Sequence, residues 1–427
     1  MSAEQFSQSY GVWPFRFLPI SYLCISKQRM AQKKHSLASL CVREYEDNKS
    51  TRPHQLPIYA TSSFAFETME EGIDIFTGKQ TGHVYGRYGN PTIDTVGQKL
   101  ADLELYGTGL SGYGFLTSSG MAAISTLILA LLKQGDGILT QADLYGGTTE
   151  LFSKVLSQAG IQPTYIDLND LDRVEGILSQ NRSVRLIYME TPANPTMRCV
   201  DILALSRLAH KYGILTVVDN TFCTPLIQQP LSLGADFVIH STTKYLNGHG
   251  NSIAGVIIGH DEKMKKQIWT TLKLVGSTCN PWDAWLINNG LKTLALRMEK
   301  HSANAMEIAR VLAGHSRIRR VNYCGLEDHA SHEIARRQMK SFGGMLSFEV
   351  DGTLKQVLEV LNKLQFCTMA PTLGDVDTLV LHPATSSHLN IDKATREAQG
   401  ITDGLVRLSV GIEQVEDILE DLQQALS

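Results

Sequence analysis

Short apolar runs rich in β-branched residues alternate with amphipathic segments between about residues 114 and 259. The pattern predicts strands within residues 114–120, 136–140, 164–168, 185–191, 215–222, 236–244 and 254–259. It predicts helices at residues 121–133, 150–160, 171–180 and 202–213. Apolar strands separated by helices are typical of a mostly parallel sheet that helices cover on both faces. We therefore expect an α/β fold.

A second, smaller α/β domain is expected toward the C-terminus. A long helix is predicted to begin within residues 281–301, and strands are predicted at residues 343–350, 377–382 and 404–411. The last segment, residues 413–426, places Val415, Ile418, Leu419 and Leu422 on one face of a helix.

Composition and charge exclude several classes of function. The 427 residues carry a net charge of −4 and show no basic stripe, so nucleic-acid binding is not expected. No apolar run reaches the roughly eighteen residues that a membrane span needs. The thirteen histidines show no metal-binding spacing, and we predict no metal. Seven scattered cysteines without a C-x-x-C pair indicate free thiols and a cytoplasmic location.

The first residues do not resemble a secretory signal. Their apolar stretch is interrupted by Pro14, Arg16 and Pro19, and Glu4 precedes it. We expect residues 1–50 to form an N-terminal extension that is poorly ordered at its start, with Met30 as an alternative start of translation.

Polar residues follow several predicted strands, and such residues meet at one edge of a parallel sheet. They include Ser119, Glu190, Asp219 and Lys244. Lys244 follows a buried strand, where desolvation would lower its pKa and favour a neutral amine suited to Schiff-base chemistry. The alternative is an ordinary surface lysine.

The other candidates each carry two interpretations. Asp219 is either a cap of the next turn or a buried anion that faces a cofactor cation. The helix start at Ser119 and Gly120 either binds an anion such as phosphate or is simply capped. Tyr85 and Arg87 either lie in a surface turn or bind a phosphate. Neither of the glycine-rich nucleotide motifs, the P-loop or the dinucleotide fingerprint, occurs.

Eight motifs in order resemble the Cys/Met-metabolism, or trans-sulfuration, family of pyridoxal-phosphate enzymes. They are YGRYGNPT, SSGMAAI, DLYGGT, ETPANPTM, VVDNTFCTP, HSTTKYLNGHG, GLKTLALRM and VRLSVGIE. The resemblance implies the type I fold of pyridoxal-phosphate-dependent transferases and a homotetramer built from active dimers. It also implies an arm at residues 51–95 that reaches the neighbouring subunit, a large cofactor-binding domain at 96–285 and a small domain at 286–427.

The resemblance also assigns roles to residues. Lys244 would bind the cofactor covalently, Asp219 would pair with its pyridine nitrogen, and Tyr145 would stack on the ring and transfer protons. The other cofactor-binding residues would be Ser119, Gly120, Met121, Asn194, Thr221, Ser241, Thr243 and, from the neighbouring subunit, Tyr85 and Arg87. Arg407 would bind the substrate carboxylate, with Thr372, Ser387 and Tyr145 nearby.

The implied activity is that of a carbon–sulfur lyase which performs γ-elimination on methionine or a related thioether amino acid. Two alternatives stay open, a γ-replacement enzyme that acts on an O-acylhomoserine and a non-catalytic binding relative. Five positions depart from patterns in the family: Gly147, Glu150, Asn251, Asn289 and Pro371. Glu150 and Pro371 replace residues that cystathionine γ-lyases tend to carry, and Gly147 replaces a cysteine usual in methionine γ-lyases.

Overall fold

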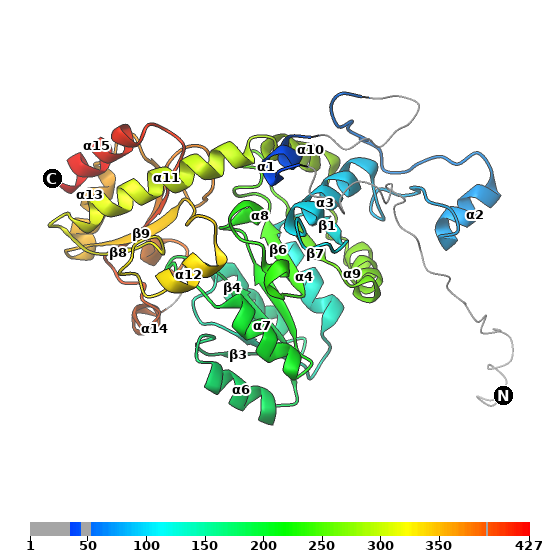
Figure 1. The fold of residues 1–427 in the computed structure, drawn as a ribbon, viewed down its shortest axis with the longest axis horizontal. Helices are drawn as coiled ribbons and strands as arrows, with labels where there is room; N and C mark the ends of the chain where they lie inside the picture. Colours follow the sequence, from blue (N-terminus) through cyan, green and yellow to red (C-terminus); the bar gives the residue numbers. More distant parts are fainter. Residues whose placement is uncertain (1–34, 44–52, 390–391) are drawn as a thin grey trace, which may run out of the picture. The chain divides into compact units, whose positions relative to one another are not determined.

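The computed structural model describes residues 35–43, 53–389 and 392–427 (Figure 1). Within these ranges the chain divides into two compact units. One contains Thr61–Asn90, and the other contains the described residues up to Ala60 and from Pro91 onward. The first thirty residues, on which the expected poorly ordered start falls, lie outside the described residues.

The Thr61–Asn90 unit contains one helix, α2 (Met69–Thr77). The Thr68 hydroxyl caps its start by accepting the Glu71 N–H at 3.1 Å. The helix ends at Gly78, whose φ of 74° lies in the left-handed region that favours glycine.

A seven-stranded sheet forms the core of the larger unit, in the order β1-β7-β6-β5-β4-β2-β3. Its strands are β1 (Tyr113–Thr117), β2 (Gly137–Thr140), β3 (Gln162–Tyr165), β4 (Val184–Glu190), β5 (Leu215–Asp219), β6 (Phe237–Ser241) and β7 (Gly255–Gly259). Strands β2 to β6 are parallel, whereas β7 runs antiparallel to both β6 and β1. The predicted mostly parallel sheet is confirmed.

Helices cover both faces of this sheet. They are α1 (Leu37–Val42), α3 (Pro91–Glu104), α4 (Gly120–Leu131), α5 (Gly146–Glu150), α6 (Leu171–Gln180), α7 (Ile202–Lys211), α8 (Thr224–Ile227), α9 (Glu262–Val275) and α10 (Pro281–Leu291), with a short 3-10 turn at Pro230–Leu233. Successive residues of β4 point to opposite faces. Tyr188 packs in the cluster under α4 and α9, and Met189 packs in the one under α6 and α7. Both faces are therefore apolar, as the sequence pattern predicted.

Helix α3 packs on β1 with its backbone almost in contact. A Cβ added at Gly97 would lie 2.3 Å from the Gly114 carbonyl oxygen, and one at Gly114 would lie 2.0 Å from the Gly97 oxygen. Only glycine fits at both positions.

The C-terminal part is a five-stranded sheet in the order β10-β11-β12-β9-β8. Its strands are β8 (Ile318–Asn322), β9 (Met345–Val350), β10 (Thr368–Met369), β11 (Leu379–Leu381) and β12 (Leu405–Ser409). Its helices are α11 (Leu294–Ala313), α12 (His332–Gln338), α13 (Leu354–Asn362), α14 (Lys393–Ala398) and α15 (Val415–Leu426), with a 3-10 turn at Pro383–Thr385. Val415, Ile418 and Leu422 are buried on the predicted face of α15. The smaller α/β part is confirmed, with β8 and β10 as strands that the sequence did not predict.

Two predicted helices differ in the structure. The single long helix expected from residue 281 is two helices, α10 and α11, separated by a turn in which the Thr293 N–H bonds back to the Gly290 carbonyl oxygen. Arg297 donates to the same oxygen at 2.8 Å. The helix expected at 150–160 is α5 followed by wider turns at Leu151–Leu156, where the Ser157 N–H bonds back to Phe152.

No helix within the described ranges is long and apolar enough to cross a membrane. Cys41, Cys199, Cys223, Cys279, Cys324 and Cys367 are buried free thiols, as predicted, and Cys24 lies outside the described residues.

Candidate active site

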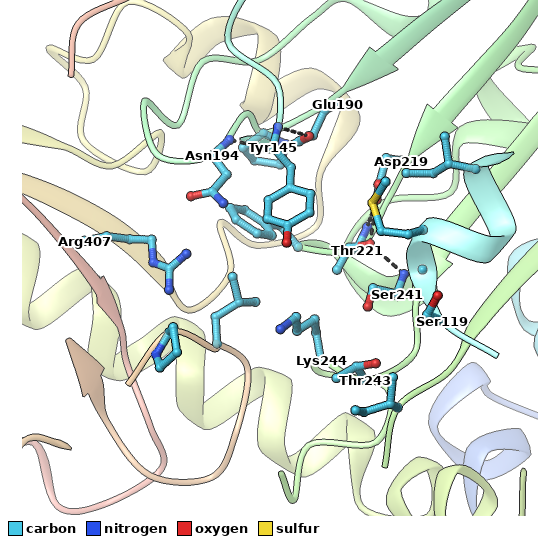
Figure 2. Close-up of a pocket in the computed structure, with 18 residues that line it drawn as sticks. Ser119, Tyr145, Glu190, Asn194, Asp219, Thr221, Ser241, Thr243, Lys244 and Arg407 are labelled. Atoms are coloured by element: carbon cyan, nitrogen blue, oxygen red, sulfur yellow. Dashed lines mark hydrogen bonds between the residues drawn. The ribbon is translucent and has the colours of Figure 1, made fainter. Parts of the chain in front are cut away.

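A cavity of about 240 Å³ lies at the carboxyl ends of β4, β5 and β6 (Figure 2). Eleven of the predicted site residues line it: Ser119, Gly120, Met121, Tyr145, Asn194, Asp219, Thr221, Ser241, Thr243, Lys244 and Arg407. The Lys244 amine and the Tyr145 phenol point into the same space, with Arg407 at one end and the hydroxyls of Ser241 and Thr243 toward the other (Figure 2). Residues far apart in sequence therefore meet at the edge where parallel strands end.

Lys244 lies three residues after β6, at the floor of the cavity. Its amine donates to the Thr372 hydroxyl at 2.9 Å. Burial, assisted by the positive charge of Arg407, lowers the pKa of Lys244 from 10.5 to about 8, and Asp375 acts in the opposite direction. The direction agrees with the expectation from sequence, and a substantial neutral fraction suits Schiff-base chemistry.

Asp219 ends β5 and is held by hydroxyl groups on both oxygens. Oδ1 accepts the Thr221 backbone N–H at 3.0 Å and the Thr221 hydroxyl at 2.5 Å. Oδ2 accepts the Tyr188 hydroxyl at 3.2 Å. The carboxylate therefore caps the next turn and also lines the cavity, and its pairing with a cofactor cation stays a prediction. Burial raises the pKa of Asp219, and a cationic ligand beside it would favour the ionised form.

Helix α4 opens toward the cavity. The Ser119 side chain caps it by accepting the Ala122 N–H at 3.0 Å. Gly120 is in close contact with Ser241, because an added Cβ would lie 2.7 Å from the Ser241 Cβ. Ser241 donates its N–H to Thr221 at 2.9 Å. The start of a twelve-residue helix and several hydroxyl groups thus form an environment suited to a phosphate.

Arg407 enters the cavity from β12 of the C-terminal sheet. Its Nη2 donates to the Thr372 carbonyl oxygen at 2.8 Å. Its buried Nε has no hydrogen-bond partner within the described part of the chain. Burial lowers the pKa of Arg407 to about 10. A buried guanidinium with an unused donor suits an anionic ligand group such as a carboxylate.

The remaining predicted site residues are not among those that line the cavity. Thr372 contacts both Lys244 and Arg407. Ser387 is exposed. Its backbone lies close to Gly146, because a Cβ added to this glycine would be 2.9 Å from the Ser387 carbonyl oxygen. Its substrate-binding role stays a prediction.

Tyr85 and Arg87 belong to the Thr61–Asn90 unit. The Arg87 guanidinium stacks on the Tyr85 ring, 5.2 Å from its centroid, and on Tyr88 at 5.1 Å. Their predicted contact with the phosphate of a neighbouring subunit stays a prediction.

Three of the departures from family patterns have a structural place here. Pro371 lines the cavity. Glu150 is exposed and pairs with Lys154 at 2.9 Å. At Gly147, an added Cβ would lie 2.6 Å from Cε1 of the Tyr145 ring, so glycine lets this ring lie directly against the backbone.

Several residues that line the cavity had no predicted role. They are Ile124, Glu190, Pro192, Phe222, Ile253, Pro371 and Leu373. Glu190 was among the polar residues at the ends of predicted strands, but nothing in the sequence assigned it a role. The apolar residues carry no such signal, since their side chains resemble those of any core.

The residues present fit pyridoxal phosphate. A lysine with a lowered pKa suits its aldehyde, and a buried carboxylate suits its pyridine nitrogen. A helix start with hydroxyl groups suits its phosphate, and an exposed aromatic ring suits its ring. Lys244, Asp219, Ser119 with Ser241, and Tyr145 would hold these four parts in turn.

Comparison with known proteins agrees with this fit. Residues 38–427 match the family described as Cys/Met metabolism PLP-dependent enzyme. An L-methionine gamma-lyase of Fusobacterium nucleatum subsp. polymorphum is 44% identical over 399 residues, which cover 93% of this chain and 99% of that protein. A cystathionine beta-lyase of Lactococcus lactis subsp. cremoris is 42% identical, over 89% of this chain and 95% of that protein.

The solved structures agree as well. The crystal structure of a cystathionine gamma synthase from Xanthomonas oryzae pv. oryzae superposes with a TM-score of 0.85 at 38% identity, over 92% of this chain and 98% of that chain. The predicted type I fold and the pyridoxal-phosphate cofactor are thereby confirmed. The chain belongs to the Cys/Met metabolism family of pyridoxal-phosphate-dependent enzymes.

Proposed function

We propose that this protein performs γ-elimination on methionine or a related thioether amino acid, consuming one water and releasing a thiol, 2-oxobutyrate and ammonia. The observation that carries the proposal is a single cavity that joins a buried arginine, a lysine with a lowered pKa and an apolar wall. The 44% identity to a protein named L-methionine gamma-lyase supports it.

The substrate would be held by its two ends. Arg407 binds the α-carboxylate through its free Nε and a second guanidinium nitrogen. The thioether chain lies against apolar side chains, of which Phe222, Ile253 and Leu373 line the cavity. None of these three side chains carries a charge that could bind a second amino-acid group.

Proton transfer falls to Lys244 and Tyr145. When bound, pyridoxal phosphate supplies the electron sink that stabilises a carbanion at the substrate α-carbon. The Lys244 amine, neutral in part near pH 7, accepts the α-proton, and a second proton must leave Cβ before the bond between Cγ and sulfur breaks. The Tyr145 phenol, whose ring points into the cavity, donates a proton to the departing sulfur (Figure 2).

The second candidate is γ-replacement, in which a thiol captures the substrate after its γ-group leaves. The structural similarity to a cystathionine gamma synthase favours it. A synthase that makes cystathionine must bind a second amino acid. Glu150 is exposed and paired with Lys154, and Pro371 carries no charge, so neither of these two positions offers a partner for such a group.

Assembly and subunit sharing are part of the proposal. We propose a homotetramer of active dimers in which Tyr85 and Arg87 reach the phosphate of a neighbouring subunit. Subunits carrying Tyr85→Phe, mixed with subunits carrying Lys244→Ala, would then recover some activity as hybrids. No recovery would count against this role.

A substrate panel tests the reaction. Purified protein with pyridoxal phosphate is incubated with methionine, and methanethiol and 2-oxobutyrate are measured. We expect both products in equal amounts, and none from Lys244→Ala. Turnover only with O-acetylhomoserine or O-succinylhomoserine plus a thiol would show that the elimination assignment is wrong and the replacement assignment right.

A further inference from the structure

Glu190 is a buried carboxylate that contacts two cavity residues at once. Its Oε2 accepts the backbone N–H of Tyr145 at 2.8 Å, and its Oε1 accepts the backbone N–H of Asn194 at 3.0 Å. The residue is only 6% exposed. Tyr145 starts α5 after β2, whereas Asn194 lies in the segment that follows β4. One side chain therefore joins two separate loops (Figure 2).

The backbone of Glu190 is itself fixed by a side chain. Gln141 donates its amide to the Glu190 carbonyl oxygen at 2.9 Å, and its amide oxygen accepts the Glu190 N–H at 3.1 Å. These two bonds extend the pairing of β2 with β4 past the end of the ladder. Glu190 is therefore fixed at both its parts. Gln141 holds its backbone, and the N–H groups of Tyr145 and Asn194 hold its carboxyl group.

Burial and the negative charge of Asp219 raise the pKa of Glu190, whereas the backbone N–H groups of Tyr145 and Asn194 act in the opposite direction. Each carboxyl oxygen accepts one of these N–H groups, and such bonds are strongest when the carboxylate is ionised. An amide in its place would accept one N–H and turn its own NH₂ toward the other, so that two donors face each other.

We propose that Glu190 is a positioning residue that holds Tyr145 and Asn194 in register with each other, so that both reach the cofactor from their separate loops. The inference rests on the proposed site, in which Tyr145 stacks on the cofactor ring and Asn194 binds the same cofactor. Glu190 acts through these two residues.

Glu190→Gln tests the proposal, with Asp421→Asn as a matched control. Asp421 is also a buried carboxylate that accepts backbone N–H groups, those of Gln365, Phe366 and Cys367, but in the C-terminal domain. Both changes replace one carboxylate oxygen by an amide nitrogen. Two measurements are made, hydrogen exchange in the cofactor-free protein and affinity for pyridoxal phosphate.

In Glu190→Gln, the amide of Tyr145 or of Asn194 should exchange about tenfold faster or more, and cofactor affinity should fall by about tenfold to a hundredfold, as expected for loss of one charge-assisted bond. In Asp421→Asn, faster exchange should be confined to residues 365–367, with unchanged cofactor affinity. Unchanged exchange at residues 145 and 194 together with unchanged affinity in Glu190→Gln would overturn the proposal. An equal loss of affinity in Asp421→Asn would overturn it too.

Glu190→Asp separates geometry from charge, and it also serves if Glu190→Gln does not fold. It keeps the charge but is one methylene shorter and cannot span both N–H groups, so it too should bind the cofactor more weakly. Wild-type affinity in Glu190→Asp would show that the charge matters and not the positioning. Failure of the wild type to bind pyridoxal phosphate would instead contradict the proposed function itself.

Discussion

The pKa of Lys244 can be shifted in opposite directions by two substitutions nearby. Burial lowers this pKa most, Arg407 lowers it further and Asp375 raises it, and the three effects together place it at about 8. Arg407→Gln should therefore raise the pKa of Lys244, and Asp375→Asn should lower it. Both side chains are themselves buried, at 5% and 7% exposure, so solvent screens these effects only weakly.

The size of the shift can be worked out. A fall from 10.5 to about 8 corresponds to ~3.4 kcal/mol at 1.36 kcal/mol per pH unit. At pH 7 about one lysine in ten is neutral at this pKa, against roughly one in three thousand at the usual value. Because the unfolded chain holds the proton of Lys244 more tightly, the free energy of unfolding of the cofactor-free protein rises as pH increases from about 8 to 10.5. Below pH 8 the lowered pKa of Lys244 reduces the free energy of unfolding by its full amount.

The rate at which cofactor-free protein captures pyridoxal phosphate measures this titration. The rate should rise about tenfold per pH unit and level off near pH 8, as the neutral amine becomes the main form. Arg407→Gln should move the midpoint upward and Asp375→Asn downward, and Lys244→Ala gives the background. A midpoint near 10.5, or a shift of both variants in the same direction, would refute the reasoning.

Two further predictions concern glycines. Gly97→Ala should destabilise the protein by about 1–3 kcal/mol, because its Cβ would lie 2.3 Å from a backbone oxygen. Gly176→Ala in α6 has open space around it and should stabilise the protein by up to ~1 kcal/mol. Thermal unfolding compares the two variants, and equal effects would contradict the packing described. Gly147→Ala should displace the Tyr145 ring and lower kcat on the order of tenfold to a hundredfold at unchanged unfolding temperature; wild-type kcat would show that the ring does not need this contact.

The strand ends were the part of the site that the sequence predicted best. Asp219 ends a mostly apolar strand, and Lys244 lies a few residues beyond the apolar part of the next strand. Parallel strands bring such ends together whatever the intervening helices contain. The assignment of individual roles came from the resemblance, since spacing alone left each residue with a structural alternative.

Contacts between distant segments could not be predicted. The two bonds of Glu190 depend on where the loops of Tyr145 and Asn194 come to lie, which no periodicity encodes. In the same way, the sequence pattern predicted one helix where the structure has α10 and α11, and the Gly290 carbonyl oxygen between them accepts from Arg297 on the next helix.

The most direct test of the central claim is to locate the cofactor on the chain. Borohydride converts a linkage between lysine and the pyridoxal-phosphate aldehyde into a stable amine, and peptide mapping by mass spectrometry then identifies the modified residue. We expect one modification per chain, at Lys244, which is lost in Lys244→Ala. Modification at another lysine, or none at all after incubation with the cofactor, would contradict it.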